Sequence, residues 1–253
     1  MLSAVLLDVD GTLIDSNEAH ARAWADILRD HGWSEITWQQ ILPLIGMGGD
    51  KLLPQVTGIE ITSPRGKALA KERTEHFLTA YAPTIRAFPK TRELLEAIRD
   101  RGLKRVIATS ANEDELEILL ERAGVADLIT RETTSDDAKG KSKPDPNIIV
   151  AALAKAHAAP GEAVMIGDTP YDVAAATKAG VKTIAFRSGG WGDEPLAGAA
   201  AIYAGPAELL ERIGESPLGS GGPGSSARHG TAAALSVARS NSPTTDSGGT
   251  THG

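Results

Sequence analysis

The sequence predicts an α/β protein in which a Rossmann-like parallel sheet forms the core and an all-helical cap domain is inserted into it. From Lys90 onward, strand-like apolar runs alternate with helix-like segments of about ten residues, which is typical of right-handed βαβ crossovers. Before that region, from Asp15 to about Arg86, the apolar residues follow helical spacing only. The core is therefore expected to be discontinuous in sequence.

The first strand is expected at residues 2–7, and Ser16 is a plausible N-cap of the first inserted helix. The later elements, in chain order, are a helix at 92–101, a strand at 103–109, a helix at 113–123, a short strand at 128–130, a helix at 147–157, a strand at 163–166, a helix at 172–179 and a strand at 183–186. The predicted parts are a core of residues 1–14 and 87–214, a cap of residues 15–86 and a disordered tail of residues 215–253, which is rich in Gly, Ser, Thr and Pro.

Composition narrows the class of protein. With 253 residues and 41% hydrophobic content, the chain can bury one substantial core or two smaller ones. The net charge of -7 argues against nucleic acid or an anionic membrane as a partner. No cysteine is present, so disulfides and thiolate metal sites are excluded, and no signal peptide or membrane-spanning run is evident. We expect a cytoplasmic protein, with a monomer favoured.

Two carboxylates follow the first strand, at Asp8 and Asp10. Side chains at i and i+2 of an extended strand project from one face, so these acids lean the same way. At an effective dielectric near 20, two like charges about 7 Å apart repel by roughly 2 to 2.5 kcal/mol. We expect a bound divalent metal ion to offset this repulsion.

Other polar residues follow later strands of the predicted sheet. Thr109 and Ser110 end the second strand, Lys143 lies in the loop before the helix at 147–157, and Asp168 and Asp172 follow the strand at 163–166. In an open parallel sheet, ligands bind beyond the carboxyl ends of the strands. These groups are therefore expected to converge on one crevice.

Over residues 1–213 the chain resembles the haloacid dehalogenase superfamily through four motifs in order. They are Asp8-Val9-Asp10-Gly11-Thr12, the strand end Thr109-Ser110, Lys143-Pro144, and Gly167-Asp168-Thr169-Pro170-Tyr171-Asp172. The helical insertion after the first motif looks like the first cap type of that superfamily, as in its phosphoglycolate phosphatase and β-phosphoglucomutase branches. The resemblance implies a Mg²⁺-dependent phosphohydrolase that works through an aspartyl-phosphate.

The resemblance implies a role for each motif residue. Asp8 is expected to be the nucleophile, and Asp10 the general acid and base, which requires a pKa raised toward neutrality. Asp8, Asp168 and Asp10, the last through its backbone carbonyl, would hold Mg²⁺. Lys143 would offset the charge of the nucleophile and the phosphoryl group.

Three more residues complete the expected site. Thr109 and, second to it, Ser110 can donate hydroxyl hydrogen bonds to a phosphoryl oxygen, although both also suit a strand end. Asp172 has two equally weighted interpretations: it belongs to the metal shell, or it is a charge that stabilises a helix N-terminus.

Phosphatase and phosphomutase both remain open for this chain. His20 and Trp24 resemble residues on the first cap helix of β-phosphoglucomutase. A mutase, however, must hold a second phosphate, and neither the cap loop at 46–51 nor the segment after Ser110 supplies the basic residues that the mutase uses there; Glu113 would repel a phosphate. A phosphatase acting on a small phosphorylated metabolite is therefore favoured.

Two cap residues, His20 and Lys51, each have two possible interpretations. His20 is a proton shuttle or hinge contact, or else a partly exposed helix histidine. Lys51 either reaches the anionic end of a substrate when the cap closes or is an ordinary surface lysine. A catalytically silent binding module on the same fold is a further alternative.

Overall fold

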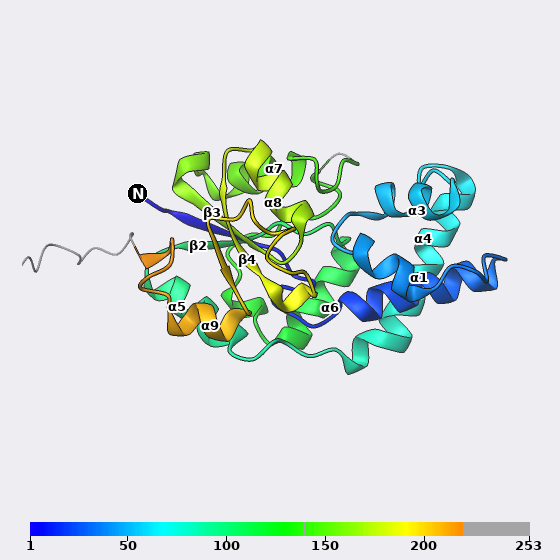
Figure 1. The fold of residues 1–253 in the computed structure, drawn as a ribbon, viewed down its shortest axis with the longest axis horizontal. Helices are drawn as coiled ribbons and strands as arrows, with labels where there is room; N and C mark the ends of the chain where they lie inside the picture. Colours follow the sequence, from blue (N-terminus) through cyan, green and yellow to red (C-terminus); the bar gives the residue numbers. More distant parts are fainter. Residues whose placement is uncertain (139, 220–253) are drawn as a thin grey trace, which may run out of the picture. The chain divides into compact units, whose positions relative to one another are not determined.

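A five-stranded parallel sheet in the order β2-β1-β3-β4-β5 forms the centre of the core (Figure 1). This computed structural model describes residues 1–138 and 140–219. The strands are β1 (Ala4–Leu7), β2 (Lys104–Ile107), β3 (Ala163–Gly167), β4 (Lys182–Phe186) and β5 (Ala201–Tyr203). β1 pairs with β2 and β3, with Leu7 in register with Ile107 and Ile166. The predicted α/β fold class is confirmed.

Helices cover both faces of the sheet. The core helices are α5 (Thr91–Asp100), α6 (Glu113–Ala123), α7 (Asn147–Ala156), α8 (Pro170–Lys178) and α9 (Pro206–Glu211). Val5 and Leu7 of β1 pack with α5, α6 and α9, whereas Ala4 and Leu6 pack with α7 and α8 (Figure 1). This alternation follows from the two-residue period of a strand, and it buries all of β1.

The sequence misplaced one strand and missed one. The predicted strand at 128–130 is wrong: Ala126–Leu128 is a 3-10 turn (η4), and only a single bridge joins Arg131 to Val106. β5 and α9 follow a segment of Ala and Gly residues with no alternating pattern, so the sequence offered no period to detect. The sheet therefore gains its fifth strand at the opposite edge from β2.

The segment between β1 and α5 is helical. It contains α1 (Asn17–Asp30), α2 (Trp38–Ile41), α3 (Gly49–Thr57) and α4 (Pro64–His76), with 3-10 turns at Leu42–Leu44 (η1) and Ala82–Thr84 (η3) and a π-helical turn at Phe77–Tyr81 (η2). Leu28, Ile41, Leu52 and Leu69 meet in an apolar cluster of its own. The described residues belong to one compact unit, so the cap limits of 15 and 86 stay a prediction.

The chain leaves the core for the cap and returns at one place. The backbone N–H of Asp15 donates to the carbonyl of Arg86 at 2.9 Å, and that of Phe88 donates to Leu13 at 3.1 Å. An antiparallel bridge joins Ile14 to Ala87 between these bonds. We call this pair of segments the neck.

The described chain remains ordered beyond the predicted end of the core. Leu218 is completely buried in the main apolar cluster, so the described part of the predicted tail packs against the core. Residues 220–253 of the predicted tail lie outside the described residues.

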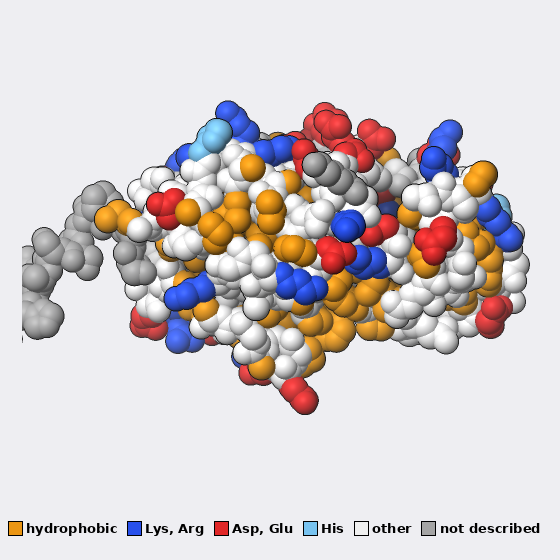
Figure 2. Space-filling view, turned by 90° about the horizontal axis from the view of Figure 1, so that it is seen from above, with side chains coloured by type: hydrophobic (Ala, Val, Ile, Leu, Met, Phe, Trp, Pro, Cys, Tyr) orange, Lys and Arg blue, Asp and Glu red, His pale blue; other side chains and the backbone are white. Residues whose placement is uncertain are grey.

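Two observations on the described residues bear on the partners that the composition argued against. None of the helices in the two described stretches combines the length and apolar character that a membrane-spanning helix needs. Figure 2 shows basic and acidic side chains interspersed on one face, without a continuous basic patch on that face.

Candidate active site

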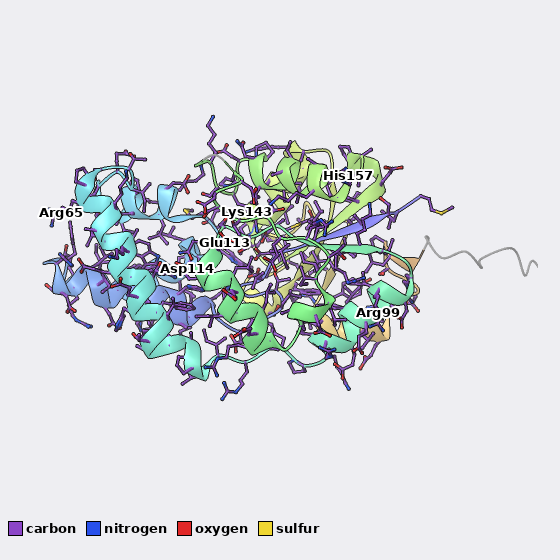
Figure 3. The ribbon with its side chains drawn as sticks, turned by 180° about the vertical axis from the view of Figure 1, so that it is seen from behind. Arg65, Arg99, Glu113, Asp114, Lys143 and His157 are labelled. Carbon is purple, nitrogen blue, oxygen red and sulfur yellow. The ribbon has the colours of Figure 1, made fainter. Side chains whose placement is uncertain are left out.

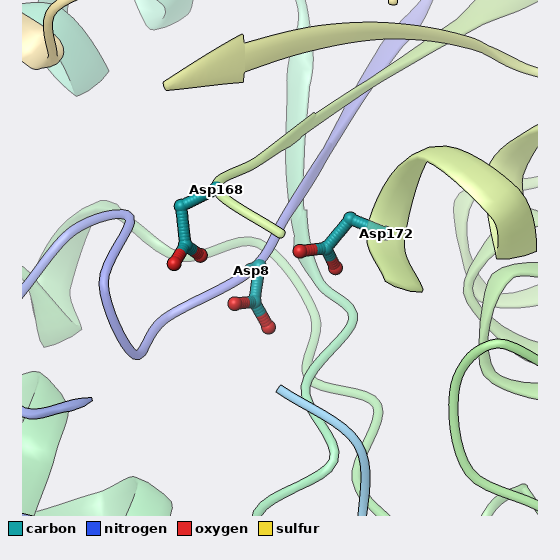
Figure 4. A group of neighbouring side chains, drawn as sticks. All are labelled: Asp8, Asp168 and Asp172. Atoms are coloured by element: carbon teal, nitrogen blue, oxygen red, sulfur yellow. The ribbon is translucent and has the colours of Figure 1, made fainter. Parts of the chain in front are cut away.

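Three buried aspartates meet at the carboxyl edge of the sheet. Asp8 follows β1, Asp168 follows β3, and Asp172 lies in the first turn of α8. Each carboxylate supplies an oxygen within 4.8 Å of an oxygen of the others, and Figure 4 shows the three side chains gathered around one point. The strands are parallel, and this is why residues far apart in sequence share one edge.

Lys143 lies among these acids. Its Nζ is 2.6 Å from Asp8 Oδ1 and 2.7 Å from Asp172 Oδ1, and its side chain is fully buried. Figure 3 shows it in the central part of the molecule. Burial lowers the pKa of Lys143, but Asp172 and Asp8 outweigh burial and hold that pKa above its usual value. The lysine is therefore a permanent cation at the sheet edge.

The cluster has excess negative charge. With all three carboxylates ionised, they and the one ammonium leave two negative charges, which is the charge that a divalent cation balances. Burial and the neighbouring Asp172 and Asp8 raise the pKa of Asp168 well above its usual value. Burial also raises the pKa of Asp8, to about 7, against the opposing effect of Lys143. Like charges held this close call for a cation.

The donor set around Asp168 fits a hydrated Mg²⁺. Thr12 Oγ1 donates to Asp168 Oδ1 at 2.8 Å, and Asn17 Nδ2 donates to Oδ2 at 3.0 Å, so the described partners of this carboxylate are neutral. Asn17 Oδ1 is buried and has no hydrogen-bond partner in the described part of the chain, and it can accept one from a metal-bound water. Mg²⁺ favours oxygen ligands and keeps several waters.

Two glycines allow the backbone to approach Asp168. Gly11 has a φ of 73°, and a Cβ there would overlap the Asp168 carboxylate. A Cβ at Gly189, in the turn after β4, would overlap the same group. Sequence reasoning missed Asn17 and Gly189 as parts of the site, and neither belongs to a motif that could have revealed it.

Asp172 serves Lys143 and its own helix. Its Oδ2 accepts from the hydroxyl of Thr169 at 2.7 Å and from the N–H of Thr169 at 3.0 Å, which closes a capping box on α8. Its Oδ1 faces Lys143. The charge of Asp172 is thus compensated by protein groups, whereas the described partners of Asp168 carry no charge.

Asp10 faces the cap and not the carboxylate cluster. Ser16 Oγ donates to Asp10 Oδ1 at 2.5 Å, and His20 Nε2 lies 2.7 Å from the same oxygen. Ser16 does occupy the N-cap position of α1, but its hydroxyl serves Asp10. Burial would raise the pKa of Asp10, yet His20 and these hydrogen bonds outweigh it and hold the pKa below its usual value. The expected rise toward neutrality is therefore not found in this state.

His20 is buried between Asp10 and the cap. It is 4% exposed, its ring stacks on Phe77 with centroids 4.0 Å apart, and its Nδ1 contacts Arg73 on α4. The alternative of a partly exposed helix histidine is therefore wrong.

A cavity of about 410 Å³ opens above these residues, between the cap and the core. Asp8, Asp10, Thr109 and Ser110 line its core side. Thr109 Oγ1 accepts from the N–H of Ala111 at 3.1 Å, and its hydroxyl hydrogen remains available for donation. Asp8 can thus meet a ligand in the cavity, while Lys143 supports it from behind.

Comparison with known proteins agrees with this geometry. The family model described as haloacid dehalogenase-like hydrolase matches residues 5–186. The chain belongs to this family. The predicted enzyme class, a phosphatase of this superfamily, is confirmed by the family match together with the phosphatase names that several relatives carry.

Two relatives illustrate the range of this hydrolase family. A phosphoglycolate phosphatase of Rhodospirillum rubrum is 30% identical over 85% of this chain and 92% of its own length. The chloroplastic protein SUPPRESSOR OF QUENCHING 1 of Arabidopsis thaliana is 32% identical over 84% of this chain, which spans only 20% of that longer protein.

Solved structures share the fold of this hydrolase. A hydrolase from Pseudomonas syringae superposes with a TM-score of 0.77 at 30% identity, covering 84% of this chain and 98% of that one. A β-phosphoglucomutase from Clostridium difficile superposes with a TM-score of 0.72 at 19% identity, covering 85% and 96%. At that identity the second likeness shows the fold alone.

The cap of this hydrolase is docked on the core by hydrogen bonds along one seam. The N–H of Gly48 donates to Ser142 Oγ at 3.0 Å, and Ser110 Oγ donates to the carbonyl of Gly46 at 3.3 Å. Lys51 belongs to this seam: its Nζ lies 2.7 Å from Asp145 Oδ2, and it does not line the cavity. The hypothesis that Lys51 contacts a substrate receives no support from this closed arrangement.

Proposed function

We propose that this chain is a Mg²⁺-dependent phosphatase that hydrolyses a small phosphorylated metabolite through a phosphoryl group carried on Asp8. The observation that carries the proposal is the buried set of Asp8, Lys143, Asp172 and Asp168 beneath the cavity between the cap and the core. A cytoplasmic monomer remains part of the proposal.

In the first step, Asp8 attacks the phosphorus. Lys143 holds Oδ1, and in the described residues no side chain bonds Oδ2, so that oxygen is available as the nucleophile. The bond from Asp8 to phosphorus forms while the bond from phosphorus to the leaving oxygen breaks. Lys143 balances the charge of the attacking group without reorganisation, because it is already fixed by Asp172.

Asp10 moves the protons of both steps. It donates a proton to the leaving oxygen and later accepts one from the water that attacks the phosphoryl group on Asp8. Its depressed pKa suits the second role directly. For the first role, an arriving phosphoryl dianion beside Asp10 raises its pKa, since a nearby like charge favours the protonated acid. His20, 2.7 Å away, is placed to exchange that proton.

The phosphoryl oxygens have donors at the core side of the cavity. Thr109 offers its hydroxyl group, whereas the Ser110 hydroxyl would first have to leave the carbonyl of Gly46; α6 begins directly after them with Asn112 as its N-cap. Unpaired N–H groups at a helix N-terminus favour an anion. Held by Asp8, Asp168 and the carbonyl of Asp10, Mg²⁺ would reduce the repulsion between these carboxylates and the substrate.

The cavity favours the phosphatase over the mutase. A mutase needs a site for a second phosphate, but Arg73, a cation of the cap, is paired with Glu115. Glu113, which we expected to repel a second phosphate, is exposed and does not line the cavity; Glu115, two residues later, does. The acid that disfavours a second phosphate is therefore Glu115.

The proposal is tested by phosphate release from p-nitrophenyl phosphate with and without Mg²⁺. We expect Mg²⁺-dependent turnover in the wild type and a loss of at least tenfold in Asp8→Asn, because removal of a nucleophile costs several kcal/mol of barrier. Asp30→Asn, an exposed change of the same kind, is the control. Absence of turnover in the wild type would favour the silent binding module.

The mutase is tested separately. β-Glucose 1-phosphate is supplied together with its bisphosphate, and formation of glucose 6-phosphate is followed. Release of inorganic phosphate without formation of the isomer supports the phosphatase; conversion to the isomer would overturn it.

A further inference from the structure

The cap side of the cavity is largely apolar. Away from Asp8, the cavity is lined by side chains of α1, α3 and α4 and the loops beside them, chiefly Trp24, Leu52, Ile61 and Ala70. This wall faces the part of a substrate that lies beyond its phosphoryl group. It offers apolar contact area to a leaving group, and its polar side chains are those of His20, Asp50, Arg73 and Thr74.

The charge of Arg73 is already neutralised within the protein by Glu115. Its Nη1 lies 2.5 Å from Glu115 Oε1, and the two side chains are 9% and 2% exposed. The hydroxyl of Thr74 donates to the same glutamate oxygen at 2.7 Å, and the Asn112 amide does so at 3.2 Å. Burial would raise the pKa of Glu115, but Arg73 and His20 outweigh it and lower that pKa. Glu115 is therefore an anion that neutralises Arg73.

The charges that remain around the cavity are mostly negative. In the described part of the chain, five carboxylates and two permanent cations, Arg73 and Lys141, line it, and Lys141 is exposed at its mouth. The carboxylates are those of Asp8, Asp10, Asp50, Glu115 and Asp136. A second anion on the leaving group would enter this region without a free buried cation among the described residues to meet it.

One polar group of this wall lacks a partner. Arg73 Nε is buried and makes no hydrogen bond in the described residues, and the Arg73 guanidinium lies 5.5 Å from the ring centroid of Trp24. Because Nε is shielded from solvent within the protein, the guanidinium does not present this donor to a ligand. Trp24, which lines the cavity, presents an aromatic face on which the C–H groups of a ligand can pack.

From these four observations we infer the substrate class: a phosphomonoester whose leaving group is an uncharged, hydroxyl-bearing alcohol such as a sugar or polyol, in preference to one that carries a carboxylate or second phosphate. This inference rests on the proposed phosphatase function. Glu115 is the residue that sets the preference, because it neutralises the cation that would otherwise attract a second anion.

Two matched pairs of substrates test the preference. Glucose 6-phosphate is compared with 6-phosphogluconate, and 2-hydroxyethyl phosphate with 2-phosphoglycolate; within each pair the second compound has a carboxylate on the leaving group. We expect kcat/KM to be at least about tenfold higher for the uncharged member of each pair. Equal or reversed preference in either pair, or turnover of neither member, overturns the inference.

A pair of variants tests the role of Glu115. Glu115→Gln retains the shape of the side chain and frees the charge of Arg73. We therefore expect the ratio of kcat/KM between the uncharged and the carboxylated substrate of each pair to fall at least fivefold, mainly through a lower KM for the carboxylated substrates. Glu117→Gln, an exposed change on the same helix, is the matched control and should leave the ratio unchanged. An unchanged ratio in a folded Glu115→Gln overturns the assignment to Glu115.

The substrate pairs remain decisive with the wild type alone if that variant does not fold. They also separate this inference from the proposed function. No turnover of any phosphomonoester, p-nitrophenyl phosphate included, overturns both, whereas turnover with a preference for carboxylated substrates overturns the inference and leaves the phosphatase in place.

Discussion

Lys143 and Asp172 form an ion pair of 2.7 Å in which neither side chain is exposed to solvent. Asp172 is in turn fixed by the hydroxyl and N–H of Thr169 at the start of α8. The position of the ammonium beside Asp8 is therefore fixed, through Asp172, by the N-terminus of α8.

Replacing Asp172 by Asn should slow the reaction by positioning Lys143 less well. We expect kcat to fall about 10- to 100-fold with little change in KM, since such supporting partners usually contribute this much. The free energy of unfolding should drop by about 1.5 to 3 kcal/mol, as for a lost charged hydrogen bond. Steady-state kinetics and denaturant titration measure both effects.

Asp137→Asn is the control for that variant. Asp137 pairs with Lys155, and both are about a third exposed, so the same change there should cost about 1 kcal/mol or less and leave kcat unchanged. A wild-type kcat in Asp172→Asn would show that Lys143 does not need this partner.

Mg²⁺ should stabilise the folded protein. At a concentration of one hundred times its Kd, a ligand that binds only the native state adds about 2.7 kcal/mol. For a chain of this size that corresponds to a rise in Tm of roughly 5 to 10 °C, which differential scanning fluorimetry can measure. The rise should vanish in Asp168→Asn and persist in Asp193→Asn, whose exposed carboxylate pairs with Arg187. A wild-type Tm that ignores Mg²⁺ would contradict the metal site.

The ion pair between Arg73 and Glu115 should make stability depend on acid pH. Because the folded pKa of Glu115 lies below its unfolded value of about 4.5, its contribution is present above pH 4.5 and is lost as the pH falls through the folded pKa. Glu115→Gln should therefore be less stable than the wild type at pH 7, and the difference should shrink on acidification. Thermal unfolding between pH 7 and pH 3 tests this, with Glu117→Gln expected to follow the wild type throughout.

His20→Gln separates hydrogen bonding from proton transfer. Glutamine can still donate to Asp10 but cannot take up or release a proton near neutral pH. We expect kcat to fall about tenfold or more and the pH profile of kcat to change shape. His31→Gln on the surface, where His31 meets Glu72, should alter neither quantity. An unchanged profile in His20→Gln would leave His20 with a structural role only.

The convergence of Asp8, Lys143 and Asp168 could be predicted from sequence because it depends on topology. Once the strands are known to be parallel, their carboxyl ends must meet at one edge, whatever the details of packing. The order and spacing of the motifs then indicated which chemical role each of these residues has. The direction of the Asp10 carboxylate could not be predicted in this way, because it depends on Ser16 and His20 of the cap.

Contacts between the cap and the core could not be predicted from the sequence. Arg73 on α4 meets Glu115 on α6, and an isolated Arg or Glu on a polar helix is normally a solvent-exposed residue. Only the docking of two helices from separate parts of the chain buries both. Asn17 was missed for the same reason, since its partner Asp168 is 151 residues away.

The neck has a consequence for how such proteins diversify. Since Asp15 and Arg86 are hydrogen-bonded neighbours, any helical insert whose two ends lie equally close can be exchanged there without shifting β1. A foreign cap grafted at these two positions would change what this enzyme accepts, provided that it keeps Ser16, Asn17 and His20, which contact the acids of the core.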